Sequence, residues 1–420
     1  MPLQGPFVVV ADSPAPDVVE ALRSAGAFPI VEATWPEALA AVVSVEPEGI
    51  VVADGCGVHN EPHAKALADW LKAANRPFTP VIARMRDDGA LPLENALAVP
   101  ASAPAARIAR RLSAAARIRT LHGTVLRRID TLSSRGETPP EMPGGDPLDD
   151  ATVLVAGRGR SYPELTVAVG ERVGLVGALS VESAARALNA RDIDGVVIGD
   201  GFSPRVVEAL LTVLAEDVRF RDLPVIALGG QYGLVENFSA DLPNLDRVAE
   251  GPARLVDRFL PFVRLHAFGE RQRRMLKSLD AKGMIDPDTG LLSHDAFWRD
   301  LNRAVDEAER RGVGLSIARF SFYRNDRRTS LDAARLVGRM MRQVDFACRE
   351  ADNSIFAVFT ETDLRAAHVI ARRIASVLKH TMLAPDAKRN IETAVTLATL
   401  KPTDNVDSLI ARVVDEVAAG

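Results

Sequence analysis

The chain contains little cysteine and few aromatic residues. Among its 420 residues there are two cysteines, Cys56 and Cys348, and aromatic residues account for 5%. Two thiols that lie so far apart in sequence do not form the disulfide framework of a small secreted domain. The seven histidines are scattered and have no metal-ligand spacing. The composition therefore predicts a cytoplasmic protein and gives no indication of a metal centre.

Long apolar runs and a strong net charge are also missing. No segment reaches about 18 consecutive apolar residues, the length at which a membrane span becomes a candidate. The opening residues, MPLQGPFVVVADSP, lack the basic stretch of a signal peptide. The net charge of −5 gives no basis for non-specific binding to nucleic acid. We therefore expect neither membrane insertion nor a nucleic-acid partner.

A weak internal repeat is present in the first part of the chain. PVIARMRDDG begins at Pro80 and PVIALGGQYG begins at Pro224, an offset of 144 residues. IVVAD ends at Asp54 and VVIGD ends at Asp200, an offset of 146 residues. Matching segments in the same order at a nearly constant offset indicate two tandem domains rather than a solenoid of short repeats.

Each repeat alternates short apolar strands with helices. The strand segments of the first repeat are FVVVA, FPIVEA, GIVVAD, FTPVIAR and ALAVP. A helix is expected after every strand, for example at 16–25 and 63–74. This pattern predicts an α/β fold in which each repeat forms a flavodoxin-like, doubly wound five-stranded parallel sheet. Such sheets carry their sites at the carboxyl ends of the strands.

The other segments give the predicted domain boundaries. Long helices are expected at 104–132 and from Pro252 to about residue 282, and the last part of the chain predicts an α+β domain. That domain is expected to have a central mixed sheet and a hairpin that turns at Asp352-Asn353. The predicted division is a first domain at 1–133, a Pro/Gly-rich linker at 134–150, a second domain at 151–270, a helical linker at 271–282 and a last domain at 283–420.

The first repeat resembles a response-regulator receiver domain, which accepts a phosphoryl group. In that family, acids after the first strand hold Mg²⁺, an Asp after the third strand is the acceptor, and a hydroxyl and a Lys bind the phosphoryl oxygens. Asp12 and Asp54 match the metal and acceptor positions, but Ala11, Met85 and Val99 occupy the other three. Asp54 is thus a candidate phosphoacceptor, with Mg²⁺ on Asp12 and Asp54 only upon phosphorylation. The alternative is a strand-end Asp that caps a loop.

The second repeat departs further from the receiver pattern. It keeps Asp200, but Gly157 and Arg158 replace the acids. Gly229 replaces the hydroxyl and Glu250 replaces the Lys. We interpret this repeat as a pseudo-receiver that serves packing, and the two receiver-like domains together as the route to a homodimer.

Three motifs in the last domain carry a second resemblance. DPDTGLLSHDAFWRDL at 286–301 is similar to the D-x-L-T-G-L-x-N-R opening of GGDEF domains, the diguanylate cyclase fold. RQVDFACR at 342–349 matches the R-x-x-D-x-x-x-R of that family, and FAV at 356–358 matches the strand after the GGDEF turn. With two receivers in front, the layout resembles the receiver–receiver–GGDEF response regulators of alphaproteobacteria. PleD-type members make cyclic di-GMP, whereas PopA-like members only bind it.

The catalytic positions of the resemblance are lost. A cyclase needs carboxylates that hold two metals and glycines that let the backbone approach the nucleotide closely. Residues 351–355, Ala-Asp-Asn-Ser-Ile, replace the GGDEF turn without a glycine or an acidic pair. Arg319-Phe320-Ser321 replaces the metal-binding D-x-D of the family, and a guanidinium repels a cation. We therefore expect the protein not to be an enzyme.

The ligand-binding positions are kept. In the family, R-x-x-D is an inhibitory site for cyclic di-GMP, so the resemblance implies binding by Arg342 and Asp345, supported by Arg373, Arg372 and Arg349. An Arg fork matches the O6/N7 edge of guanine or a phosphate, and an Asp can accept from the guanine N–H groups. R-x-x-D also occurs at 84–87, 127–130, 191–194 and 254–257, so only its place in the GGDEF frame has weight. The alternative is a surface ion pair.

These observations favour a non-catalytic cyclic di-GMP effector that requires no cofactor. The PopA-like resemblance implies a cell-cycle role at a cell pole, in which the protein delivers a replication regulator to a protease adaptor. Two alternatives stay open. One is a divergent diguanylate cyclase that makes cyclic di-GMP from GTP, and the other is a scaffold that binds no nucleotide.

Overall fold

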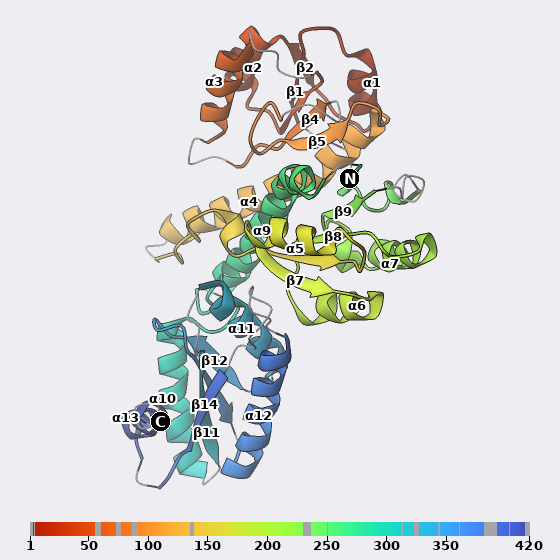
Figure 1. Cartoon of the computed structure of the whole chain (residues 1–420). Coiled ribbons are helices and arrows are strands. Elements are labelled where there is room, and N and C mark those ends of the chain that lie inside the picture. The colour runs from red at the N-terminus through yellow and green to blue at the C-terminus, as the bar shows by residue number, and fades with distance from the viewer. Residues whose placement is uncertain are drawn as a thin grey trace.

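The protein is described by a computed structural model (Figure 1). Its described residues are 3, 5–54, 60–72, 77–85, 91–134, 138–229, 237–249, 251–281, 283–311, 314–322, 327–342, 345–360, 362–381, 393–402 and 404–415.

The first unit is a five-stranded parallel sheet with the predicted flavodoxin-like order, β2-β1-β3-β4-β5. Strands β1, β3 and β5 are buried along their whole length, because their residues are apolar or Gly throughout, without polar interruption. The strands are β1 (Phe7–Val10), β2 (Ile30–Ala33), β3 (Gly49–Val52), β4 (Val81–Met85) and β5 (Leu97–Pro100).

Three helices cover this sheet: α1 (Pro16–Ser24), α2 (Trp35–Val45) and α3 (Glu61–Leu71). Each has a Pro in its first turn, where no backbone N–H is needed. The helix predicted between the fourth and fifth strands is wrong for residues 91–96, which form turns. Residues 86–90 lie outside the described part.

The second unit repeats the same sheet order, β10-β9-β8-β6-β7, so the repeat in the sequence corresponds to two sheets of like topology. All four of its strand pairings are parallel. Its strands are β6 (Thr152–Ala156), β7 (Gly174–Ala178), β8 (Gly195–Ile198), β9 (Val225–Leu228) and β10 (Leu245–Val248). Its helices are α5 (Tyr162–Gly170), α6 (Val181–Ala190) and α7 (Pro204–Glu216), and short 3₁₀ turns lie at η2 (Pro147–Asp149) and η3 (Val218–Phe220).

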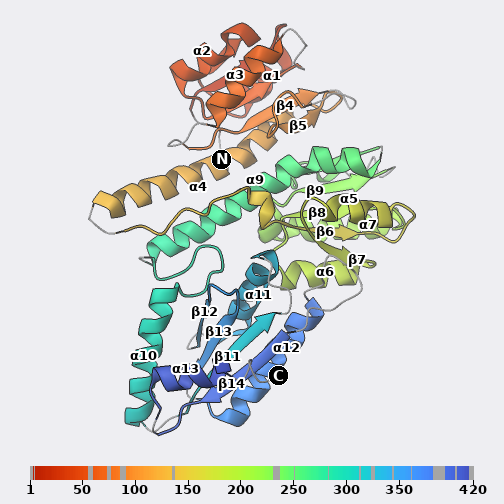
Figure 2. The ribbon, with the colours of Figure 1, turned by 60° about the vertical axis from the view of Figure 1, so that its left-hand side comes forward.

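Two long helices, α4 (Ala106–Ser134) and α9 (Pro252–Asp280), join the first two units. They pack side by side, as Figure 2 shows, and Val125 of α4 lies against Met275 and Leu279 of α9. Helix α9 runs without interruption through residue 270, where the second domain was predicted to end. The helix pair therefore forms one continuous support beneath the first unit and beside the second.

The third unit is a four-stranded sheet of order β12-β13-β11-β14. The hairpin predicted around Asp352-Asn353 is present between β12 and β13. The predicted mixed sheet is wrong for the described strands, because every pairing among them is antiparallel. Its elements are α10 (His294–Arg311), β11 (Leu315–Phe322), α11 (Arg327–Met340), β12 (Phe346–Arg349), β13 (Ile355–Thr360), α12 (Leu364–Thr381), β14 (Thr393–Thr399) and α13 (Val406–Asp415).

The strand order explains why the mixed sheet is not seen. Helix α11 connects β11 to β12, and these two strands run in the same direction, but β13 lies between them. Helix α12 connects β13 to β14 in the same way, and β11 lies between those two. Each helical crossover thus joins two strands that run in the same direction, but another strand lies between them, so no parallel pair forms among the described strands.

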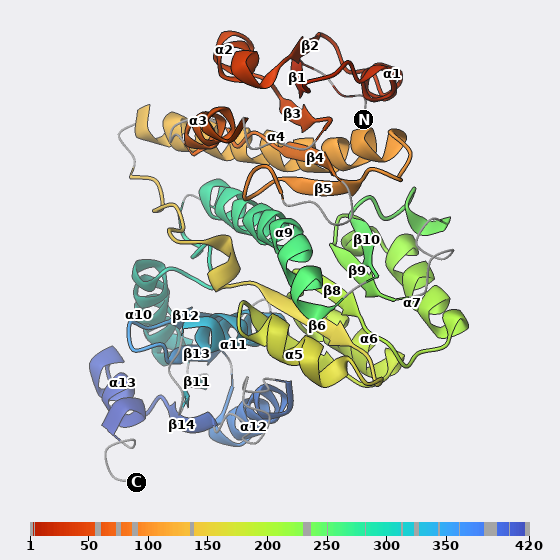
Figure 3. The same ribbon diagram turned by 45° about the horizontal axis from the view of Figure 1, so that its top comes forward.

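The three units follow one another along the molecule, as Figures 1 and 3 show. Helix α11 of the third unit contacts the segment before β6, where Arg328 Nε donates to the Asp149 carbonyl at 2.9 Å. Arg328 Nη2 donates to the Leu148 carbonyl at 3.0 Å. Among the helices of the described residues, none is both long and apolar enough to cross a membrane.

Candidate functional site

The R-x-x-D segment lies where helix α11 gives way to strand β12. Arg342 is exposed just beyond the last residue of α11, and Asp345 immediately precedes β12. The Asp345 backbone N–H donates to the Arg342 carbonyl at 3.1 Å, so the two residues belong to one tight turn. Residues 343 and 344 lie outside the described part. The turn leaves the Arg342 guanidinium available at the surface.

Asp345 is not the surface residue that the sequence suggested. Only 9% of it is exposed, and its Oδ1 accepts a hydrogen bond from the Thr360 backbone N–H at 3.2 Å. Burial raises the pKa of the Asp345 carboxyl, and hydrogen bonds from Thr360 and Arg342 only partly offset this. Asp345 thus holds the start of β12 against the end of β13. This structural role was hidden in the sequence because Thr360 is distant along the chain.

The three supporting arginines lie on other elements. Arg372 and Arg373 are exposed on α12, and no hydrogen bond or ion pair of either is found among the described residues. Arg349 is the last residue of β12, which places it about 13 Å along the strand from Asp345. There its Nη1 donates to Asn353 Oδ1 at 3.0 Å. The structure thus joins Arg342 to Asp345 and places Arg349 at the opposite end of the strand.

The turn at residues 351–355 is closed by an ion pair. Arg319, at the centre of β11, reaches it from the neighbouring strand. Its Nη2 donates to Asp352 Oδ2 at 2.5 Å, and its Nε donates to Ser354 Oγ at 3.2 Å. Ser354 in turn donates to Asp352 Oδ1, from N at 2.9 Å and from Oγ at 2.6 Å. Arg319, Asp352 and Ser354 therefore form one connected polar group, which we call the turn lock.

The turn lock determines the ionisation of its carboxylate. Burial alone would raise the pKa of Asp352, but hydrogen bonds from Ser354 and the Arg319 guanidinium outweigh it and hold that pKa below its usual range. The backbone is fixed as well, because Asn353 adopts a left-handed φ of 64° and its carbonyl accepts from Ser330 Oγ at 3.1 Å. Asp352 is therefore an ionised carboxylate that is already neutralised by a guanidinium.

This geometry does not suit a two-metal site. Arg319 Nη2 lies 2.5 Å from Asp352 Oδ2, so a cation bound at that oxygen would be repelled by the guanidinium. Within the described ranges, no group of three or more His, Cys, Asp or Glu residues is arranged to hold a metal ion. The sequence did not predict the turn lock, although the opposite charges of Arg319 and Asp352 were a usable signal.

In the first unit, the carboxyl edge of the sheet brings Asp12 and Asp54 together as predicted. The Asp54 carboxylate accepts from the Asp12 backbone N–H at 3.2 Å and from the Ser13 N–H at 3.4 Å. Asn60, which the sequence analysis missed, donates from Nδ2 to Asp12 Oδ2 at 2.6 Å. Met85 ends β4 and is buried. Two carboxylates and an amide are a minimal oxygen set for Mg²⁺.

In the second unit, the Asp200 carboxylate already accepts hydrogen bonds from a neighbouring residue. Its Oδ1 accepts from Ser161 Oγ and from the Ser161 backbone N–H. The Gly159 backbone packs so closely that a Cβ there would lie 2.2 Å from Asp200 Cγ. Arg158 turns away and donates from Nε to the Gly201 carbonyl at 3.0 Å. Glu250 lies outside the described residues. Asp200 is therefore hydrogen-bonded through Oδ1 to Ser161 and tightly packed on its Gly159 side.

Comparison with known proteins gives similar structures only. No family model matches the chain, and no curated protein matches it. The coiled coil and GGDEF domain of DgcB from Caulobacter crescentus, solved in complex with c-di-GMP, is 22% identical with a TM-score of 0.31, over 36% of this chain and 86% of that chain. Diguanylate cyclase SiaD from Pseudomonas aeruginosa, in complex with its activator SiaC, is 16% identical with a TM-score of 0.30. This match covers 36% of this chain and 66% of that chain. The FimX GGDEF domain from Pseudomonas aeruginosa is 16% identical with a TM-score of 0.29, and the match covers 33% of this chain and 95% of that chain.

Proposed function

We propose that this protein is a non-catalytic effector that binds cyclic di-GMP through the R-x-x-D turn of its third unit. The observation that carries the non-catalytic part is the turn lock. Arg319 neutralises Asp352 at 2.5 Å, where a cyclase would present carboxylates to metal ions. The resemblance implies that the GGDEF turn and the metal-binding D-x-D are lost, whereas Arg342 and Asp345 are kept. This combination supports a domain that senses the nucleotide without making it.

The binding part of the proposal depends on Arg342. Its guanidinium is exposed, planar and permanently charged, so it can bond a guanine edge or a phosphate at two points. Asp345 is mostly buried, so it contributes through its remaining accessible oxygen and by fixing the turn. Arg373 and Arg372 are exposed on α12 and are proposed as the second cationic side of the ligand site.

Two assays on the full chain test this function. Incubation with GTP and Mg²⁺ or Mn²⁺ should give no cyclic di-GMP, and calorimetric titration with cyclic di-GMP should give saturable binding. Appreciable product would favour the divergent cyclase. Absence of both product and binding would favour the scaffold.

We also propose a wider role that follows the PopA-like resemblance. The two receiver-like units mediate a homodimer, and the effector recruits protein partners for regulated proteolysis, at a cell pole. Asp54 is the proposed phosphoacceptor, with Mg²⁺ on Asp12 and Asp54, whereas the enclosed Asp200 takes no phosphoryl group. Light scattering of the full chain at increasing concentration tests the homodimer, and a strictly monomeric protein would contradict it. Treatment with a small phosphodonor followed by mass spectrometry tests the two acceptor assignments.

A further inference from the structure

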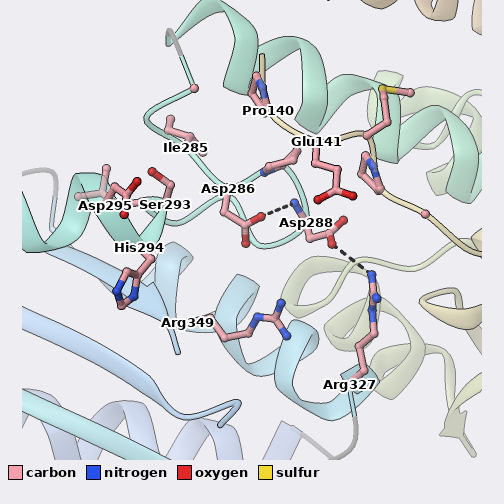
Figure 4. Close-up of a pocket in the computed structure, with 16 residues that line it drawn as sticks. Pro140, Glu141, Ile285, Asp286, Asp288, Ser293, His294, Asp295, Arg327 and Arg349 are labelled. Atoms are coloured by element: carbon pink, nitrogen blue, oxygen red, sulfur yellow. Dashed lines mark hydrogen bonds and ion pairs between the residues drawn. The ribbon is translucent and has the colours of Figure 1, made fainter. Parts of the chain in front are cut away.

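A cleft lies between the linker that precedes the second unit and the third unit (Figure 4). Its volume is about 590 Å³, and sites for small ligands typically measure roughly 300–1,000 Å³. Linker residues 140–144 form one wall, and the residues around the turn before α10 form another. We call it the linker cleft; its charged lining side chains are Glu141, Asp286, Asp288, Asp295, Arg327 and Arg349.

Both walls are attached to helix α9 by arginine side chains. Arg271, only 3% exposed, donates from Nη1 to the Gly145 carbonyl at 3.1 Å and from Nη2 to the Asp146 carbonyl at 3.0 Å. On the other wall, Arg274 Nε donates to the Pro287 carbonyl at 2.7 Å. The cleft is therefore held open by the fold itself, and a ligand needs to order little of the chain when it binds.

The charges that line the cleft are not all compensated. Asp288 pairs with Arg327 at 3.2 Å, and Arg327 also reaches Asp150 at 3.4 Å. Arg349, in contrast, bonds the amide oxygen of Asn353, and it has no ion pair within the described part of the chain. Glu141, on the opposite wall, has neither a hydrogen bond nor an ion pair to any described residue. Arg349 and Glu141 thus face the cleft from opposite walls with capacity for a ligand.

The net charge of the lining side chains indicates which charges the ligand should carry. Four carboxylates and two guanidiniums give 2 − 4 = −2 with His294 neutral, so the lining is acidic. An acidic cleft disfavours nucleotides and other polyanions and favours a ligand of net positive charge. Arg349 has one acceptor, the Asn353 amide oxygen, and its guanidinium can still pair with a carboxylate through two parallel hydrogen bonds. The ligand must therefore combine a carboxylate with a cationic end.

We propose that the linker cleft binds a cationic amino acid, with arginine as the representative. Its carboxylate bonds the Arg349 guanidinium, and its cationic side chain pairs with Glu141. Asp286 lies nearby and adds negative charge, but its oxygens already accept from the Asp288 N–H and from Thr289 Oγ1. The ligand touches both the linker and the third unit, so its binding holds these two segments together. This site is separate from the R-x-x-D turn, because neither Arg342 nor Asp345 lines the cleft.

Calorimetric titration of the full chain with three related compounds tests the proposal. L-arginine carries both ends, agmatine lacks the carboxylate, and L-citrulline lacks the guanidinium charge. Arginine should bind at least about tenfold more tightly than either, which corresponds to about 1.4 kcal/mol. In Arg349→Gln, arginine and agmatine should bind alike. In Glu141→Gln, the advantage of arginine over citrulline should shrink.

The controls separate this site from the proposed function. Arg342→Ala should bind arginine like the wild type, and Glu141→Gln should bind cyclic di-GMP like the wild type. Absence of arginine binding at about 10 mM, which corresponds to an affinity of about −3 kcal/mol, overturns the proposal. Tighter binding of agmatine than of arginine also overturns it, as does an unchanged ratio of the two in Arg349→Gln.

Discussion

At the scale of single residues, one guanidinium organises the hairpin of the third unit. Arg319 stands on β11, and its guanidinium is largely buried beside the turn. Its Cζ also lies 5.9 Å from the centre of the Phe356 ring. Arg319 thus combines packing with an ion pair. The sequence singled out Arg319 but did not predict Asp352 as the partner that it pairs with.

The turn lock should make stability depend on acid pH. The folded-state pKa of Asp352 is lowered, so its stabilising contribution is present above its unfolded pKa of about 3.9 and is lost as pH falls through the folded pKa. Because 51% of the Asp352 side chain is exposed, we expect at most about 1 kcal/mol. Urea unfolding at pH 7 and at about pH 3.5 should show a smaller acid loss for Asp352→Asn than for the wild type. Equal losses would contradict the lock.

The effect of Asp345 on stability should depend on pH in the opposite sense, because burial raises the pKa of its carboxyl. The folded state then favours the protonated form, so ionisation at neutral pH destabilises the fold. Asp345→Asn keeps an acceptor for the Thr360 N–H without the charge and should be at least as stable as the wild type at pH 7. Asp345→Ala leaves that N–H unpaired and should lower the free energy of unfolding by about 1–3 kcal/mol. Equal destabilisation of both variants in urea unfolding would argue against this role.

At the scale of elements, the sequence predicted what local patterns encode. Apolar runs such as FVVV at 7–10 gave the strands of the parallel sheets, and the repeat predicted that two sheets share one order. The hairpin at Asp352-Asn353 was predicted because Asn tolerates the left-handed turn that it adopts. The direction of neighbouring strands in the third sheet was not predictable, because β13 inserts between β11 and β12 through contacts that are distant in sequence.

Helix α11 should connect the third unit to the second. Arg328 donates to the Leu148 and Asp149 carbonyls, and Arg335 and Arg339 both reach Asp192. Removal of the Arg328 guanidinium takes away both carbonyl bonds, so this junction should open more often. Hydrogen exchange measured by mass spectrometry should therefore be faster at 147–150 in Arg328→Ala.

The control for the α11 junction is Arg365→Ala, which changes an exposed arginine of α12. Exchange at 147–150 should stay at the wild-type rate in this variant. Unchanged exchange in Arg328→Ala as well would mean that the carbonyl contacts do not hold the junction.

At the scale of the whole molecule, one buried carboxylate joins the first two units. Asp246 of β10 is 2% exposed and pairs with Arg111 at 3.3 Å, Arg258 at 3.2 Å and Arg107 at 3.6 Å. Burial lowers the pKa of Arg111 to about 9, and the charge of Asp246 opposes this. Asp246→Ala would leave three guanidiniums without this partner.

We expect Asp246→Ala to lower the free energy of unfolding by about 3–5 kcal/mol, the usual effect of breaking a buried pair. Asp241→Ala changes an exposed carboxylate of the same unit and should alter stability by at most about 0.5 kcal/mol. Denaturant unfolding of both variants measures the difference. If Asp246→Ala lowers the free energy of unfolding no more than Asp241→Ala does, Asp246 does not join the first two units as proposed.

At this scale we propose that the molecule is a sensor at one end of an extended support. The first two units and the paired helices α4 and α9 form that support, and the third unit carries the R-x-x-D turn and the turn lock. The central claim is that Arg342 binds cyclic di-GMP in a domain that no longer makes it. Everything proposed about partners depends on this claim.

Calorimetric titration of the full chain with cyclic di-GMP tests that claim most directly. Wild type should bind, and Arg342→Ala should lose at least tenfold in affinity, since truncating one partner of a charged contact costs about 2–5 kcal/mol. Arg342→Lys should lose nearly as much, because an ammonium lacks the planar fork. Arg303 and Asp306 form another R-x-x-D sequence, exposed on α10, and Arg303→Ala should bind cyclic di-GMP like the wild type. Wild-type affinity in Arg342→Ala would contradict the account.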